Sequence, residues 1–173
     1  TVAWAMAAYR DFIANHDGTF ILGGDSAGGG LAATVAQQAR DAGLRQADGL
    51  ILICPWLDVT VSHPDQKRIE PRDCILTIAG GQMAGRMYAR DIALEDPRVS
   101  PINGSWTGLP PVLAFGGDDD ILLTDARALA AKLSTADYVE GDGLMHDWPI
   151  FFFAESRRAQ AKMAEFALQH VAH

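Results

Sequence analysis

The sequence predicts an α/β fold in which a mostly parallel sheet is flanked by helices. Short apolar runs typical of buried strands alternate along the chain with segments whose apolar residues recur at helical spacing. Glycine or proline follows most of the apolar runs and marks where each strand ends. Strands that alternate with helices pair in parallel, because each helix crosses over and returns the chain in the same direction.

Length and composition fit this class. The chain has 173 residues, which suits one domain, and 49 % of them are apolar, enough to bury a core. The net charge of −8 disfavours nucleic acid and anionic membrane surfaces, which attract clusters of Lys and Arg. No stretch approaches the roughly 20 apolar residues of a membrane span, so we expect no stable membrane association. Cys54 and Cys74 need no disulfide and suit a reducing compartment, which predicts a cytoplasmic location.

The first part of the chain predicts a helix, a strand and a second helix. Apolar residues at helical spacing predict a helix at 2–14, and an apolar run with β-branched and aromatic residues predicts a strand at 19–22. Residues 23–26, Gly-Gly-Asp-Ser, predict a turn. Alanine, leucine and glutamine at helical density predict a helix at 27–40, which Gly43 should end.

The central part predicts two strands separated by an irregular excursion. The run at 49–54 predicts a buried strand that Pro55 ends. Residues 56–101 contain several prolines, many charges and one convincing helix, at 77–90, so we interpret them as an excursion between core elements. The run at 112–115 predicts the next strand, which the glycine pair after it should stop.

The last part predicts a helix at 125–134, a weak strand at 138–140 and a final helix at 155–170. No internal repeat interrupts this alternation. Residues 1–173 are therefore expected to form a single domain.

Gly24-Asp25-Ser26-Ala27-Gly28 fits the pattern G-x-S-x-G, with a predicted strand directly before it and a predicted helix directly after it. That context suits a nucleophile elbow, a sharp turn that projects the Ser26 hydroxyl above the sheet. The turn crowds Cβ atoms two residues to either side, so Gly24 and Gly28 should supply the missing side chains. The Ala27 N–H, near the start of the helix, should be one donor of an oxyanion hole.

This glycine-rich turn has three other interpretations. The simplest is a strand-to-helix turn in which Ser26 only caps the helix. A phosphate-binding P-loop is excluded because Leu31, rather than lysine, follows Gly30. Gly28, Gly30 and Ala33 loosely fit a dinucleotide fingerprint, but they lie after the turn rather than in it.

A serine nucleophile needs a histidine base, and a nucleophile elbow predicts the chain order Ser, Asp or Glu, then His. His146 fits, because it follows the last predicted strand and lies on a loop. The other histidines are less well placed: His16 precedes the serine, His63 lies in the excursion, and His170 and His173 stand at the chain end.

The acid that orients the histidine should lie on the loop after the strand at 112–115. Asp118, Asp119 and Asp120 stand there. A cluster of three aspartates is usually only solvated, and spacing does not choose among them.

Several short motifs together resemble those of the hormone-sensitive-lipase-like branch of the α/β-hydrolases, the bacterial family IV esterases. The motifs, in chain order, are GDSAGG at 24–29, CPWLD at 54–58, VSP at 99–101, LPP at 109–111, DIL at 120–122 and GLMH at 143–146. The resemblance covers nearly the whole chain. It implies an α/β-hydrolase fold with Ser26 as nucleophile, Asp120 as acid and His146 as base, and it makes Asp58 and Asp125 structural carboxylates.

One departure from the family pattern is informative. The family carries an H-G-G-G segment upstream of the nucleophile that completes the oxyanion hole, and this sequence contains no such segment. The family's earlier strands and N-terminal cap helices are also absent. We therefore expect a C-terminal portion of a longer enzyme. Loss of one oxyanion donor typically costs about 10²–10³ in rate, so the chain alone should hydrolyse esters weakly.

The resemblance implies a serine carboxylic-ester hydrolase that acts on small or short-chain acyl esters through an acyl-enzyme, without metal or organic cofactor. Two alternatives remain open at this level. One is a catalytically weak or inactive small-molecule receptor of the same fold, and the other is a hydrolase of a related amide, lactone or acetylated substrate. The expected partner is a small ester, not nucleic acid or membrane. Whether the chain forms a homo-oligomer is left open by the sequence.

Overall fold

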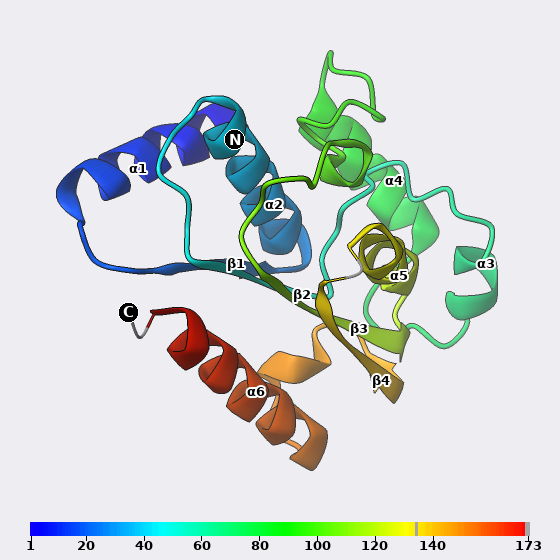
Figure 1. Cartoon of the computed structure of the whole chain (residues 1–173). Helices are drawn as coiled ribbons and strands as arrows, with labels where there is room; N and C mark the ends of the chain where they lie inside the picture. The colour runs from blue at the N-terminus through cyan, green and yellow to red at the C-terminus, as the bar shows by residue number, and fades with distance from the viewer. Residues whose placement is uncertain (134, 172–173) are drawn as a thin grey trace.

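The computed structural model describes residues 1–133 and 135–171 and contains one sheet of four parallel strands. The strands follow one another in chain order, β1 (Ile21–Asp25), β2 (Gly49–Ile53), β3 (Val112–Asp119) and β4 (Asp137–Met145). Helices flank the sheet on both sides (Figure 1). The predicted α/β class with a parallel sheet is therefore confirmed.

Six α-helices and two short 3₁₀ turns connect or follow the strands in the described part of the chain. Their bounds are α1 (Val2–Asn15), α2 (Ser26–Asp41), α3 (Gln66–Ile69), α4 (Ile78–Ala89), η1 (Pro101–Asn103), α5 (Leu123–Lys132), η2 (Trp148–Ile150) and α6 (Ala154–Val171). The predicted helices all form. The excursion at 56–101 also holds α3 and η1, which were not predicted, and position 134, the predicted end of α5, lies outside the described residues.

Local signals explain where these helices begin and end. The Thr77 side chain accepts a hydrogen bond of 3.1 Å from the Gly80 N–H and caps the start of α4. Gly43 follows the end of α2 with a left-handed φ of +63°, and Leu44 donates back to the Ala39 carbonyl at 2.9 Å. This is a glycine-terminated helix end, as the sequence predicts.

Two strands are longer or displaced relative to the prediction. β1 begins at Ile21 rather than at 19 and continues through Gly24 to Asp25, because its whole length pairs with β2 from Gly49 to Ile53. The residues predicted as a turn are therefore mostly strand, and only Ser26 leaves the sheet. A Cβ on Gly23 would lie 2.8 Å from a backbone oxygen of β2, so glycine at this position allows the two strands to lie close together.

β3 does not stop at its glycine pair. It runs on to Asp119 because β4 pairs with it beyond that point, including Gly117 with Gly141. A Cβ on Gly117 would lie 2.3 Å from the Leu144 carbonyl oxygen. The glycines thus admit close approach by β4, which in turn extends from Asp137 to Met145, well beyond the predicted 138–140.

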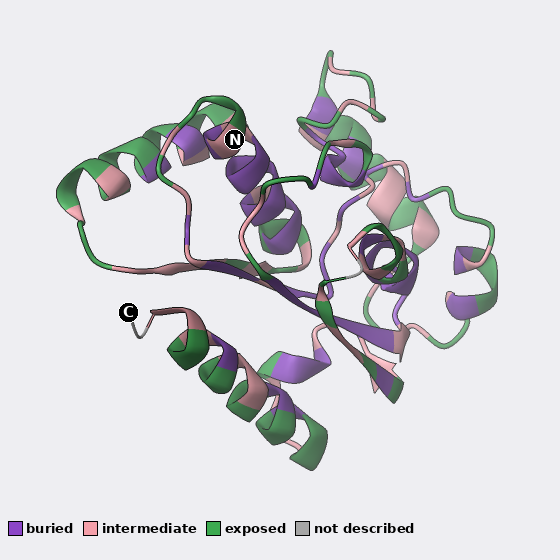
Figure 2. Ribbon diagram, in the orientation of Figure 1, coloured by how far each residue is buried: buried purple, intermediate pink, exposed green. Residues whose placement is uncertain are grey.

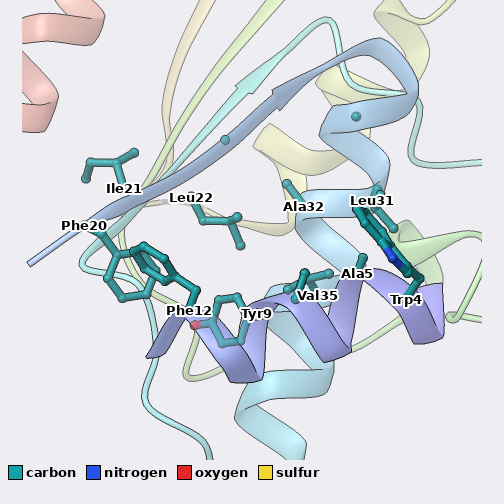
Figure 3. Close-up of a pocket in the computed structure, with 13 residues that line it drawn as sticks. Trp4, Ala5, Tyr9, Phe12, Phe20, Ile21, Leu22, Leu31, Ala32 and Val35 are labelled. Carbon is teal, nitrogen blue, oxygen red and sulfur yellow. The ribbon is translucent and has the colours of Figure 1, made fainter. Parts of the chain in front are cut away.

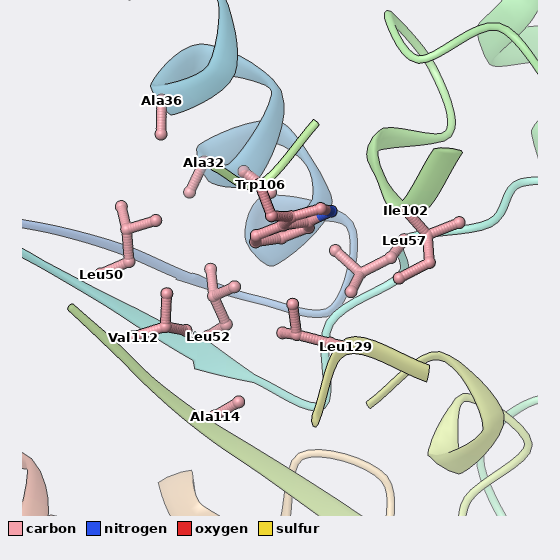
Figure 4. Close-up of a cluster of buried hydrophobic side chains, with 11 residues drawn as sticks. Ala32, Ala36, Leu50, Leu52, Leu57, Ile102, Trp106, Val112, Ala114 and Leu129 are labelled. Carbon is pink, nitrogen blue, oxygen red and sulfur yellow. The ribbon is translucent and has the colours of Figure 1, made fainter. Parts of the chain in front are cut away.

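The core has one apolar layer on each face of the sheet. On one face, α2 and α5 cover inward side chains of β2 and β3 such as Leu50, Leu52 and Ala114 (Figure 4). On the other face, α6 packs Phe166 against the alternate residues, among them Ile53 and Phe115. The central strands β2 and β3 are mostly buried between the two layers, while the edge strands β1 and β4 and the outer faces of α1 and α6 are more exposed (Figure 2). Covering both faces explains why the strands read as continuous apolar runs.

Within residues 1–133 and 135–171, no helix combines the length and apolar character needed to cross a bilayer.

Candidate active site

The chemistry-bearing residues stand where the strands end. Ser26 follows β1, Cys54 follows β2, Asp120 follows β3 and His146 follows β4. Because all four strands are parallel, their carboxyl ends meet at one edge of the sheet. Segments separated by up to 120 positions in the sequence therefore converge on one site.

The turn that carries Ser26 is strained and tightly packed. Ser26 has a φ of +50°, a left-handed conformation that non-glycine residues seldom adopt, and it opens α2 directly after the last residue of β1. A Cβ on Gly24 would lie 2.4 Å from the backbone carbon of Gly28, so only glycine fits there. This backbone places the hydroxyl at the top of the strand, as a nucleophile elbow requires.

The steric reason predicted for Gly28 is wrong. A Cβ on Gly28 would have only the Asp25 carboxylate nearby, at an ordinary contact distance of 3.7 Å. The backbone of Gly28 is what crowds Gly24. The helix positions that do require glycine are the next two, since a Cβ would lie 2.9 Å from Pro55 at Gly29 and 2.1 Å from the Trp56 carbonyl oxygen at Gly30.

Ser26, His146 and Asp120 form one continuous chain of hydrogen-bonding contacts. Ser26 Oγ lies 2.9 Å from His146 Nε2, and His146 Nδ1 lies 2.8 Å from Asp120 Oδ2. Asp120 is fully buried and His146 is 3 % exposed, whereas Ser26 is partly exposed at the surface of the site. The structure thus brings together the three residues that chain order and family resemblance select.

The geometry separates Asp120 from its two neighbours, which spacing alone did not. The second oxygen of Asp120 accepts the Leu122 N–H at 2.8 Å, which fixes the carboxylate plane toward His146. Asp119 instead forms an ion pair with Arg72. Asp118 accepts the Gly143 N–H at 2.6 Å and so braces the β4 turn.

Burial and hydrogen bonding act in opposite directions on the ionisable groups. Burial disfavours the charged form of His146, but the hydrogen bonds to the carboxylates of Asp120 and Asp147 outweigh it and raise the pKa of His146. Burial raises the pKa of Asp120, and the hydrogen bond from His146 counteracts that rise. The neighbouring carboxylates therefore stabilise the positive charge that the imidazole acquires when it takes up a proton.

Asp147 is a residue of the site that the sequence did not reveal. Its Oδ2 lies 3.2 Å from His146 Nε2, the same nitrogen that faces Ser26. Position next to the histidine was the only available signal, and adjacency does not show that a side chain turns back toward its neighbour.

The predicted oxyanion donor is suitably placed. Ala27 is the second residue of α2, so its N–H belongs to the first turn, where helix N–H groups lack a partner within the helix. Ala27 and Ser26 both line a largely apolar pocket of about 230 Å³ that also includes Trp56, Leu76 and Ala84. The two residues therefore border the same space.

The two carboxylates that the resemblance makes structural do hold backbone. Asp125 is buried, and its Oδ2 accepts the N–H groups of Leu57 and Asp58 at 2.8 Å each. Asp58 accepts the Thr60 N–H at 2.9 Å. These bonds fix the segment after β2 against α5.

Cys54, Asp120 and His146 have ligand-type atoms within 4.8 Å of one another in the described part of the chain. Both nitrogens of His146 already face hydrogen-bonding partners, so a metal ion at this cluster would have to displace Asp120 or Ser26. Burial raises the pKa of the Cys54 thiol well above its ordinary range, which opposes the thiolate form that a metal prefers.

A second apolar pocket, of about 490 Å³, lies between α1, β1 and α2 (Figure 3). Trp4, Phe12 and Leu22 line it, and Ser26, Asp120 and His146 do not. It is therefore separate from the triad residues.

Comparison with known proteins shows the family and the fold. A model of the α/β-hydrolase fold family matches residues 2–150. An acetyl-hydrolase of Streptomyces hygroscopicus is 36 % identical over 166 residues, which are 90 % of this chain and 54 % of that protein. An esterase of Acinetobacter venetianus is 33 % identical over 154 residues, 85 % of this chain and 51 % of that protein.

Solved structures give the same result. A crystal structure of an esterase from the bacterial hormone-sensitive lipase family superposes with a TM-score of 0.92 at 28 % identity. The superposition covers 98 % of this chain and 60 % of the esterase chain. The chain thus spans about half the length of the curated relatives it matches.

Proposed function

Since the chain belongs to the α/β-hydrolase family, in its hormone-sensitive-lipase-like branch, we propose that it is the triad-bearing part of a serine carboxylic-ester hydrolase. The observation that carries this proposal is the continuous contact from Ser26 Oγ through His146 to the buried carboxylate of Asp120. Residues 1–173 act as one catalytic domain in this proposal, and its two free thiols suit the cytoplasm.

The proposed reaction begins when Ser26 Oγ attacks the ester carbonyl carbon. With Nδ1–H held by Asp120, Nε2 takes the hydroxyl proton as the new carbon–oxygen bond forms. The imidazolium then gives this proton to the leaving alcohol as the old ester bond breaks, which leaves an acyl group on Ser26. Water attacks the acyl-enzyme in the same way, with His146 as base, and releases the carboxylic acid.

Charge develops on two groups during this reaction, and the site contains a stabilising group for each charge. The carbonyl oxygen becomes negative in the tetrahedral intermediate, where the Ala27 N–H and the N-terminal end of α2 offer a donor and a favourable dipole. The imidazole becomes positive, where Asp120 supplies the compensating charge.

The pocket beside Ser26 favours short, uncharged acyl esters. At about 230 Å³ it is smaller than most small-molecule pockets, and apolar residues with the small side chains of α4 line it. Two curated relatives are named esterase and acetyl-hydrolase, which fits a small acyl group. An ester of acetate or butyrate is therefore the substrate class that we propose.

Hydrolysis of p-nitrophenyl acetate and butyrate tests the proposal directly. Ser26→Ala should abolish activity above the spontaneous rate, whereas Ser105→Ala, which removes the same atom from an exposed loop, should leave it unchanged. Retention of ester hydrolysis by a clean preparation of Ser26→Ala would end the proposal.

A further inference from the structure

Two carboxylates, rather than one, face the imidazole of His146. Asp120 occupies the Nδ1 side at 2.8 Å, and Asp147 Oδ2 approaches Nε2 at 3.2 Å. The other oxygen of Asp147 is buried and finds no hydrogen-bond partner among the described residues. A buried carboxylate oxygen without a hydrogen-bond partner is costly, so the position of Asp147 serves the site rather than the fold.

The backbone holds Asp147 in this position. Asp147 has a left-handed conformation, with φ of +57° and ψ of +22°. The next residue, Trp148, is buried and donates from its indole N–H to the Gly116 carbonyl at 3.0 Å. The Asp147 carbonyl also accepts the Ile150 N–H at 3.0 Å. With the following residues anchored, the carboxylate has little freedom to turn away from His146.

The remaining groups near the imidazole carry no positive charge. Ser26 from α2 is a neutral hydroxyl, and burial keeps the Cys54 thiol at the end of β2 protonated. Asp73 adds a further negative charge on the far side of Asp120. No Lys or Arg among the described residues is paired with Asp120 or Asp147. The protonated imidazole is therefore the counter-charge that these two carboxylates share.

We propose that Asp147 is a positioning residue that stabilises the protonated imidazole of His146 from the Nε2 side. This inference rests on the proposed function, because it concerns the same proton transfer. Nε2 is directed at Ser26 Oγ, so Asp147 acts on the ring through its charge at 3.2 Å: it attracts the positive imidazolium and gains little from a neutral imidazole. The raised pKa of His146 agrees with this geometry.

The inference has a distinctive kinetic consequence. Asp147 stabilises the imidazolium equally in the protonated resting enzyme and in the transition state. At low pH both states contain the imidazolium, so removing the carboxylate should leave kcat/KM unchanged there. At high pH the resting enzyme holds neutral imidazole and only the transition state contains the imidazolium. Removing the carboxylate should therefore lower kcat/KM there by the same factor by which it raises the acid ionisation constant of His146.

Asp147→Asn is the informative substitution, because asparagine has nearly the same shape and also tolerates a left-handed backbone. In the profile of kcat/KM against pH, the acid limb of this variant should lie about one to two pH units lower. The value of kcat/KM on the alkaline plateau should fall about 10- to 100-fold. Asp142→Asn removes the same charge from an exposed position on β4 and should change neither. A role in folding alone would instead lower the rate by one factor at every pH.

NMR titration of the His146 ring separates this inference from the proposed function, because it needs no substrate. The His146 signal is assigned by its loss in His146→Gln. A fall of at least about one pH unit in its titration midpoint in Asp147→Asn, with none in Asp142→Asn, supports the role of Asp147 even if esters are not hydrolysed. An unchanged midpoint in Asp147→Asn would overturn it, whatever the esterase activity.

Discussion

The backbone N–H of Trp56 donates a hydrogen bond of 2.9 Å to the carbonyl oxygen of Ser26. The bond joins the segment after β2 to the first residue of α2, at the point where Ser26 takes up its strained conformation. Gly30 approaches the Trp56 carbonyl on the other side of this contact. Neighbouring backbone, rather than the serine side chain, therefore keeps the turn in place.

Gly24→Ala should disrupt this turn. The added methyl would lie 2.4 Å from the Gly28 backbone, which cannot move without shifting α2. We expect a loss of about 3 kcal/mol or more of unfolding free energy, measured by urea denaturation, together with loss of ester hydrolysis.

Gly28→Ala is the matched control for that experiment. The same methyl would meet only the Asp25 carboxylate at 3.7 Å, and alanine is the better helix former. Its unfolding free energy should be unchanged or slightly higher. Equal destabilisation by the two substitutions would show that crowding is not what selects glycine at position 24.

Asp120→Asn tests the choice of acid. Asparagine removes the charge that stabilises the imidazolium and leaves the fold intact, so kcat should fall about 10³- to 10⁴-fold. Asp119→Asn breaks only a surface ion pair with Arg72 and should change kcat little. Steady-state kinetics on p-nitrophenyl butyrate distinguish the two, and a greater loss in Asp119→Asn would contradict the assignment.

Asp125 should make stability depend on pH. Burial raises its pKa from 3.8 to about 7, although two backbone N–H groups favour the ionised form. The folded state therefore binds a proton that the unfolded state has lost, and this contribution is present at low pH and disappears as pH rises from about 4 through about 7. Urea unfolding at about pH 4.5 and about pH 7.5 should show a decline that Asp125→Asn reduces.

Asp125→Ala should behave differently from Asp125→Asn. The amide oxygen of asparagine can still accept the N–H groups of Leu57 and Asp58, whereas alanine leaves the buried Leu57 N–H and the partly buried Asp58 N–H unpaired. A cost of about 1–3 kcal/mol for each group predicts a total loss of about 2–6 kcal/mol. Similar stability of the two variants at low pH would refute the bracing role of Asp125.

The pocket beside Ser26 predicts a change in chain-length preference. Ala84→Leu should fill part of the pocket and lower kcat/KM for p-nitrophenyl butyrate at least about tenfold more than for the acetate ester. Ala79→Leu places the same side chain on an exposed part of α4 outside the pocket and should leave the ratio unchanged. An unchanged ratio in Ala84→Leu would place the acyl group elsewhere.

Much of the fold follows from local pattern. Strands such as β2, buried on both faces, read as continuous apolar runs, and helices such as α2 have clear ends, so their order and direction are predictable. The limits of β3 and β4 are not, because pairing between distant segments sets them. Glycines at 116 and 117 look like a stop in sequence, yet both pair with β4: a Cβ would meet side chains of β4 and α5 at Gly116 and the backbone of β4 at Gly117.

The residues of the site likewise fall into those that the sequence predicts and those that it does not. Ser26 and His146 can be found from the order of motifs and predicted strand ends, since parallel strands bring those ends together. Asp120 could be chosen among three aspartates only through family resemblance, because the choice depends on hydrogen bonds to Leu122 and His146. Asp147 and the reason for each glycine depend on backbone conformation, which sequence spacing does not encode.

Covalent labelling with a fluorophosphonate, followed by mapping of the adduct by mass spectrometry, tests the triad most directly. Such reagents phosphonylate a serine only when a base activates its hydroxyl and an oxyanion donor stabilises the product. We predict one adduct, on Ser26, that is absent in Ser26→Ala and nearly absent in His146→Ala. An adduct on another residue, or undiminished labelling of Ser26 in His146→Ala, would contradict it.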